Sequence, residues 1–241
     1  ILSVVGIMFF ARLIIEGNYS LLEINKSATL GSIIAIILNL FLTSIHEAAH
    51  AFTTKYYKKR VDRGGLVLYL GLPCLYVDTN EIWLAGKRAR IMVSLSGPLS
   101  TMFIGSICAV FITFFPSFAY NDILFKICFW GFLGAIINLN PLLELDGYYI
   151  LIDYLKKPML RSKSIIYLKE TIQNLIFKKE IKKLEWDKVT YGIMASIWSF
   201  LSVVLVILII EYRSKRIIRD FFLQNSMFIK VIGLSVLLFW M

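Results

Sequence analysis

The 241-residue sequence has few residues that can bind a metal through nitrogen or sulfur. It contains two histidines, His46 and His50, and three cysteines. Cys74, Cys108 and Cys128 form neither a close pair nor a Cys-x-x-Cys motif, so a disulfide framework is not indicated. Cys108 and Cys128 lie in apolar runs, where cysteine usually behaves as a small buried hydrophobic residue.

Charge is scarce as well. Charged residues make up 17% of the chain and hydrophobic residues 58%, with a mean hydropathy of +0.73. Soluble domains are usually only about 45–50% apolar. The net charge of +10 comes with no motif that reads DNA or RNA. In so hydrophobic a chain it predicts basic loops beside anionic cytoplasmic lipid, so the expected partner is a lipid bilayer and not a nucleic acid.

Six apolar runs predict an all-α polytopic membrane protein, a bundle of about six transmembrane helices. They cover residues 1–15, 28–52, 91–115, 123–139, 191–210 and 228–241. The second run is long enough to cross about 30 Å of hydrocarbon at 1.5 Å per residue. The first run lacks a small-residue cleavage site, which favours a transmembrane helix over a signal peptide. Because the first and last runs look truncated, we expect the sequence to be a segment of a longer protein.

Residues 64–78 have a different character. Gly64-Gly65 opens this stretch, Gly71-Leu72-Pro73 interrupts it, and β-forming residues flank the interruption. The pattern predicts a small β-hairpin between the second and third spans. Because exposed strand edges cannot face lipid, the hairpin should be covered by protein or lie in a wet cavity.

The chain divides into four expected parts. Residues 1–27 are an N-terminal helix and external loop, residues 28–155 a core of three spans, residues 156–189 a basic cytoplasmic segment, and residues 190–241 the C-terminal helices. The basic segment is either an amphipathic helix on the cytoplasmic leaflet or an ordinary solvated helix. Lysines and arginines at 55–63 place the end of the second span on the cytoplasmic side. The basic cluster at 213–219 conflicts with simple alternation and leaves the last two spans without an assigned orientation.

Both histidines belong to one motif, His46-Glu47-Ala48-Ala49-His50. Residues at i and i+4 of a helix project from one face, so both imidazoles can bind one zinc ion. Glu47 lies beside the first ring, where a carboxylate can take a proton from a zinc-bound water. The motif lies near the cytoplasmic end of the second span.

A catalytic zinc site typically needs a third protein ligand, which the sequence must supply from an acidic residue or a cysteine. Asp146 follows the fourth span at the end of the membrane where the second span also ends. Asn138 and Pro141 precede it and break the helix. Alternatively, Asp146-Gly147 is only a helix-ending turn. The main rival ligand is Glu144, with Asp78 and Cys74 behind it.

With these motifs, residues 27–153 resemble the site-2 protease family of intramembrane zinc metalloproteases. The chain matches that family's HExxH motif at 46–50 and its NxxPxxxLDG pattern from Asn138 to Gly147. The segment Ser96-Gly97-Pro98 is similar to the family's small-Gly-Pro segment, although Thr101 stands where the family often has asparagine. Residues 72–79 together with Asp146-Gly147-Tyr148-Tyr149 look like the bacterial peptide zinc metalloprotease branch.

The resemblance implies a Zn²⁺ cofactor held by His46, His50 and Asp146, with Glu47 as general base and Asn138 helping to stabilise the oxyanion. It implies an intramembrane endopeptidase in a bacterial cell membrane, acting near the cytoplasmic side. The expected substrate is a membrane-associated peptide or protein, including a bacteriocin-type or modified peptide. The hairpin would either pair with an extended substrate or serve only as a covering loop.

Two other classes of function are compatible with these residues. One is a metal-binding transporter, with the motif and Asp146 on an ion path. Transporters usually spread their ligands over several spans, whereas here both imidazoles share one helix with a glutamate between them. The other is an inactive membrane scaffold for peptide export or immunity, although every expected catalytic residue is present.

Overall fold

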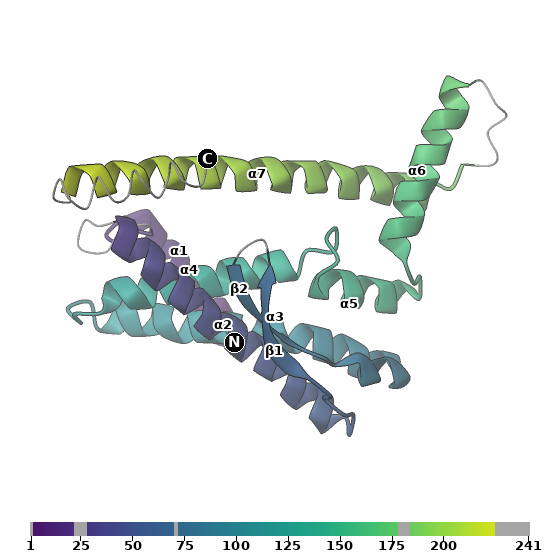
Figure 1. Ribbon diagram of the computed structural model, residues 1–241. Helices are drawn as coiled ribbons and strands as arrows, with labels where there is room; N and C mark the ends of the chain where they lie inside the picture. Colours follow the sequence, from purple (N-terminus) through teal and green to yellow (C-terminus); the bar gives the residue numbers. More distant parts are fainter. Residues whose placement is uncertain (1, 22–27, 70–71, 178–183, 225–241) are drawn as a thin grey trace.

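The computed structural model describes residues 2–21, 28–69, 72–177 and 184–224, and the described chain is mostly helical (Figure 1). It contains one small sheet of two strands. In chain order the elements are α1 (Leu2–Glu16), α2 (Ala28–Tyr56), β1 (Gly64–Tyr69), β2 (Leu72–Val77), the 3-10 helix η1 (Asn80–Leu84), α3 (Lys87–Phe114), α4 (Asn121–Asn138), α5 (Asp146–Leu155), α6 (Leu160–Ile176) and α7 (Trp186–Gln224).

Four of the described helices are long and apolar enough to cross a membrane. These segments are Ile33–Tyr56, Lys87–Phe114, Asn121–Asn138 and Trp186–Leu208. They agree with four of the six predicted spans. The predicted first span is the 15-residue helix α1, shorter than the roughly 20 residues that a span needs. The predicted sixth span, residues 228–241, lies outside the described residues, so the count of six is not confirmed.

Helix α3 is the centre of the bundle. It packs against α1, α2, α4 and α5. Small residues allow the close crossing of α3 and α4: a Cβ at Gly131 would lie 2.8 Å from the Thr101 carbonyl oxygen. The buried apolar cluster between these helices and α1 includes Cys108 and Cys128. Both are free thiols, as expected.

The predicted hairpin is present, with β1 and β2 antiparallel and Gly64 opposite Val77. Directly after β2, the Asp78 N–H donates to the Arg63 carbonyl at 2.7 Å. Because ladder bonds form at every second residue of an antiparallel strand, residues 72, 74 and 76 of β2 direct their N–H and C=O groups toward β1. Residues 73, 75 and 77 therefore point theirs away from β1. This explains how Pro73 fits in a strand, because its position needs no ladder N–H. β2 is thus an edge strand, and it packs against α2.

Two helices extend further than the sequence patterns suggested. Helix α3 starts at Lys87, four residues before the apolar run 91–115, and continues through Pro98. The predicted span 191–210 is part of α7, a single helix of 39 residues that continues through the basic cluster at 213–219. The basic segment contributes α6, which lies at a steep angle to α7 (Figure 1).

Candidate metal centre

Helix α2 presents both histidines to the bundle interior. His46 and His50 are one turn apart, their ring centroids are 4.7 Å apart, and each residue is only 8% exposed. The apolar run that forms α2 buries this face against α3. The i, i+4 spacing therefore acts as predicted and directs two imidazoles toward one point.

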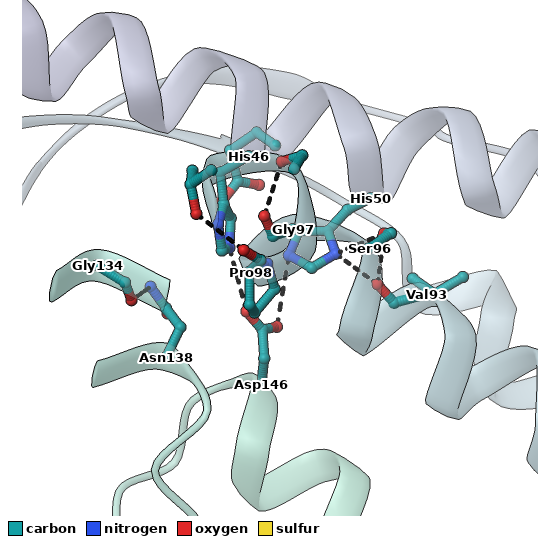
Figure 2. A network of polar contacts seen from close by, with 12 residues as sticks. His46, His50, Val93, Ser96, Gly97, Pro98, Gly134, Asn138 and Asp146 are labelled. Carbon is teal, nitrogen blue, oxygen red and sulfur yellow. Dashed lines mark hydrogen bonds and ion pairs between the residues drawn. The ribbon is translucent and has the colours of Figure 1, made fainter. Parts of the chain in front are cut away.

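Asp146 reaches the same point from the first turn of α5. Its Oδ2 lies 3.1 Å from His46 Nε2 and its Oδ1 lies 3.4 Å from His50 Nε2 (Figure 2). Gly147 makes this approach possible, because a Cβ there would overlap the Leu139 carbonyl and lie 2.9 Å from Asn140 N. The loop after α4 can thus fold back against the start of α5 and leave the Asp146 carboxylate facing α2.

The three side chains fit a zinc ion. Their potential ligand atoms all lie within 4.8 Å of one another. Zinc bonds of 2.0–2.2 Å in a tetrahedral arrangement separate neighbouring ligand atoms by about 3.4 Å, close to both observed nitrogen–oxygen distances. Burial alone would raise the pKa of the Asp146 carboxyl, but the neighbouring His46 and His50 rings outweigh it and hold the pKa below its usual range. The carboxylate is therefore in the charged form that binds a cation.

The ring of His50 is oriented by α3. Its Nδ1 lies 2.7 Å from the Val93 carbonyl oxygen, an acceptor only, so Nδ1 carries the proton and donates it. The Ser96 hydroxyl donates to the same carbonyl at 2.7 Å. With Nδ1 directed at Val93, His50 Nε2 is the ring nitrogen that faces Asp146, and it is the atom that a metal ion would use. A backbone carbonyl that fixes the tautomer of a ligating histidine is a recurring feature of metal sites.

Gly97 on α3 lies directly against both imidazoles. A Cβ at this position would be within 2.6 Å of His46 Nε2 and would also overlap the His50 ring. The sequence shows Gly97 only as the middle of a Ser-Gly-Pro segment, which does not by itself give the glycine a role. The signal was present, since a glycine inside a continuous helix often marks a close approach. What it approaches is visible only in the fold.

Glu47 faces the hairpin. Its Oε2 accepts a hydrogen bond of 2.9 Å from the Val77 N–H, one of the β2 groups that point away from β1. The carboxylate lies next to His46 in sequence, so one helix and one strand edge together position it beside the metal centre.

The other candidate site residues are not part of this ligand cluster. Asn138 lies nearby, but its Nδ2 donates to the Gly134 carbonyl at 2.9 Å within α4 (Figure 2). Glu144 pairs with Arg161 at 3.7 Å, and Asp78 accepts a hydrogen bond from the Asn80 N–H. Among the residues that the structure describes, the ligand cluster is His46, His50 and Asp146, without Glu144, Asp78 or Cys74.

A cavity of about 360 Å³ opens beside this cluster, and we call it the outer cavity. Arg90 and Asp153 form a 2.7 Å ion pair in its wall, and Trp83 and Tyr149 contact each other edge to face. No sequence pattern had pointed to Trp83 or Asp153. The lining residues are His46, Glu47, His50, Val77, Thr79, Asn80, Ile82, Trp83, Arg90, Val93, Ser94, Asn138, Glu144, Leu145, Asp146, Tyr149 and Asp153.

Together, the fold and the site define a helical protein of membrane-spanning character with a candidate His-His-Asp metal centre and an adjacent glutamate. No family model matches the chain. The chain is similar to a protein of Bacillus subtilis (strain 168) named "Putative peptide zinc metalloprotease protein YydH", with 29% identity over 125 residues. The alignment covers 51% of this chain and 47% of the relative, so the chain matches about half of that protein's length.

Proposed function

We propose that this chain is an intramembrane zinc endopeptidase that hydrolyses a peptide bond in a membrane-associated peptide or protein. One observation carries the proposal: His46, His50 and Asp146 converge within 4.8 Å, with Glu47 adjacent and a cavity of about 360 Å³ open to them. The name of the Bacillus subtilis relative supports zinc-dependent proteolysis.

Zinc held by three protein ligands lowers the pKa of a bound water and polarises a carbonyl. Glu47 is the proton carrier in this scheme. Its Oε1 takes the proton of the attacking water and later passes it to the leaving amine. The Val77 N–H holds the other oxygen and keeps the carboxylate directed at the reacting atoms. Asn138 can donate to the oxyanion if its amide turns from the Gly134 carbonyl toward the cavity.

An extended substrate fits the edge of β2. A helix hides its carbonyls, so a peptide bond must be presented in an extended segment. The backbone groups of Leu75 point away from β1 on the same edge as Val77, whose N–H bonds to Glu47. A strand added along this edge would run past the proton carrier. Basic residues in the last turn of α2 and directly after it support a position of the site near the cytoplasmic side: Lys55, Lys58, Lys59 and Arg60.

The test is Glu47→Gln in the full chain, purified in detergent micelles and loaded with zinc. Glu170→Gln is the matched control, because this exposed carboxylate on α6 does not line the outer cavity. The probe is a tryptic digest of bacterial membrane proteins, with new termini counted by mass spectrometry. We expect Glu47→Gln to keep one zinc per chain and to lose at least about a hundredfold in cleavage, the contribution typical of a general base.

Unchanged cleavage by Glu47→Gln would contradict the proposed role of this residue. Absence of cleavage by the unmodified, zinc-loaded protein would contradict the proposed function itself. Loss of zinc from Glu47→Gln would place Glu47 among the ligands instead.

A further inference from the structure

Helix α6 crosses α7 near its start instead of running beside it. Figure 1 shows the two helices at a steep angle, with the end of α6 continuing past α7 on the side away from α3 and α4. The segment Trp186–Leu208 of α7 is long and apolar enough to cross a membrane. With α7 across the membrane, a helix so inclined runs close to the membrane plane, at the level where α7 begins.

Two contacts with α7 show which side of α6 faces the membrane interior. The Arg161 guanidinium donates to the Ser199 hydroxyl at 3.0 Å. The Tyr167 hydroxyl accepts a hydrogen bond of 3.0 Å from the N–H of Glu185, the residue before α7. Ser199 lies about 20 Å further along the helix than Glu185 at 1.5 Å per residue. The side of α6 that carries Arg161 therefore faces deeper along α7, and the side that carries Tyr167 faces its start.

The side of α6 that faces deeper along α7 is apolar. Three isoleucines follow Arg161 at i+4, i+11 and i+15, spacings that fall on one helix face, and we call them the isoleucine face: Ile165, Ile172 and Ile176. Ile172 is 46% exposed and Ile176 is 69% exposed, so the described chain does not cover them beyond the crossing. At the level where α7 begins, this face is directed at the hydrocarbon boundary of the membrane.

The opposite side of α6 is mostly polar. Lys163 and Glu170 lie seven positions apart on this side and are exposed, with Ile166 as the apolar exception. Lys169, also exposed, lies at the border between the polar side and the isoleucine face. An apolar face bordered by lysines is typical of a helix that lies in the membrane interface with its polar side in water. Long lysine side chains can reach lipid phosphates while their stems stay on apolar surface.

Positive charge gathers where α6 begins. A hollow of about 330 Å³ lies between the turn after α5 and the start of α7, and we call it the lysine hollow. Glu185 and Asp187 in its wall each pair with a lysine, whereas Lys156 and Lys163 have no acidic partner among the described residues. The lysines outnumber the carboxylates, so the hollow attracts anions. Its charged wall residues are Lys156, Lys157, Lys163, Glu185, Asp187 and Lys188.

We infer that α6 is an interfacial helix that docks on anionic phospholipids at the membrane surface where α7 begins. The isoleucine face lies against the upper part of the acyl chains, and the lysines without acidic partners bind the lipid phosphates. An ordinary solvated helix, the other interpretation of this basic segment, would leave the isoleucine face in water. The inference stands apart from the proposed function, because docking on lipid requires neither zinc nor proteolysis.

The first experiment measures the surroundings of the two sides of α6. Single cysteines are introduced in the full chain with Cys74→Ser and labelled with the fluorophore NBD: Ile172→Cys on the isoleucine face and Glu170→Cys, the matched control, on the polar side. The chain is reconstituted in vesicles of equal parts phosphatidylcholine and phosphatidylglycerol. We expect blue-shifted NBD emission from Ile172→Cys, quenched by phospholipids that are spin-labelled at the top of the acyl chain. Emission from Glu170→Cys should match that of NBD in water.

The second experiment measures selectivity for anionic lipid. Native mass spectrometry of the full chain in detergent counts bound phosphatidylglycerol, with phosphatidylcholine and glycerol phosphate as comparison probes. We expect phosphatidylglycerol to bind more tightly than either comparison probe. Lys163→Gln should weaken its binding about fivefold, the effect of one lysine near an anionic membrane surface. The matched control is Lys215→Gln, which removes an exposed lysine that pairs with Glu211 far along α7 and should leave the binding unchanged.

Several outcomes would overturn the inference. Water-like emission from both labels would show that α6 is a solvated helix. Blue-shifted emission from Ile172→Cys without quenching by the lipid spin labels would show that protein, and not lipid, covers the isoleucine face. Equal binding of phosphatidylglycerol and phosphatidylcholine, equal binding of glycerol phosphate, or unchanged binding in Lys163→Gln would each contradict docking on anionic phospholipid. Neither experiment measures zinc or cleavage, so these outcomes leave the proposed function as it stands.

Discussion

At the scale of single residues, the site depends on side chains that are small or absent as much as on those that bind. His46, His50 and Asp146 can meet because Gly97 leaves room for two rings and Gly147 lets the loop after α4 approach α5. The Val93 carbonyl binds His50 Nδ1 and so directs Nε2 toward Asp146. The candidate ligands are therefore positioned by glycines and a backbone carbonyl that carry no recognisable motif.

Gly97→Ala tests this dependence. Helix propensity alone would raise the free energy of unfolding of the alanine variant by about 1 kcal/mol. The added Cβ, however, must displace both imidazoles, since real Cβ contacts below 3.0 Å essentially do not occur. We expect zinc affinity to fall about tenfold or more, as when groups that orient metal ligands are altered. Competition with a chelating dye measures the affinity, and Gly86→Ala is the control. An unchanged affinity would show that the rings do not face α3 when zinc is bound.

At the scale of elements, the hairpin and α5 each hold one part of the site in place. Strand β2 fixes Glu47 through the Val77 N–H. Helix α5 carries Asp146 in its first turn and Asp153 two turns later, where Arg90 of α3 binds it at 2.7 Å. Asp153 is only 6% exposed, so this ion pair is largely removed from water. Each contact joins a carboxylate in the wall of the outer cavity to an element distant in sequence.

Val77→Pro removes the N–H that holds Glu47. The strand should persist, because residue 77 lies on the edge of β2 that already accommodates Pro73 without ladder bonds. We expect zinc content to stay at one per chain while cleavage of the membrane-protein digest falls about tenfold. Val77→Ala, which keeps the N–H, is the control. Equal activity of both variants would show that Glu47 is positioned without the hairpin.

Asp153→Asn leaves the Arg90 guanidinium without its counter-charge in the wall of the outer cavity. Breaking a buried pair on one side typically costs about 3–5 kcal/mol, and the partial exposure of Arg90 should lower this to about 2–3 kcal/mol. We expect a lower midpoint of thermal denaturation in detergent and weaker zinc binding, because α5 also carries Asp146. Asp187→Asn, which breaks an exposed pair with Lys157, should change neither quantity. If Asp153→Asn lost stability but kept its zinc affinity, α5 would not depend on this pair to position Asp146.

At the scale of the whole molecule, the candidate metal centre and the turn between α3 and α4 lie toward opposite ends of the bundle. The metal centre lies near one end of α2, beside the start of α3 and the end of α4. The turn between α3 and α4 lies at the other end of the bundle (Figure 1). Aromatic side chains gather there, with ring contacts among Phe111, Phe115, Phe118 and Tyr120, as is common at membrane–water interfaces.

Membrane orientation can be tested with single cysteines in a Cys74→Ser background, because Cys108 and Cys128 are buried. We expect Ser117→Cys to react with an impermeant maleimide added outside intact cells. Lys58→Cys should react only after the membrane is opened, since basic residues accumulate on the cytoplasmic side. The reverse pattern would place the metal centre on the outer side.

The sequence by itself determined the membrane character, four of the spans, the hairpin and the motif at 46–50. Each of these is a local pattern, readable from hydropathy, turn residues or i, i+4 spacing within one element. It also pointed to Asp146, but it could not separate this residue from Glu144, because two carboxylates two positions apart in a loop share the same local signals.

Only the tertiary structure decided which carboxylate faces the imidazoles, that Gly97 lies against both rings, and that β2 holds Glu47. These contacts join residues 30 to 100 positions apart, such as Val77 with Glu47 and Asp146 with His46. Their geometry follows from how α2, α3, α4 and α5 pack, and packing between distant elements leaves no periodic trace in the sequence of any one of them.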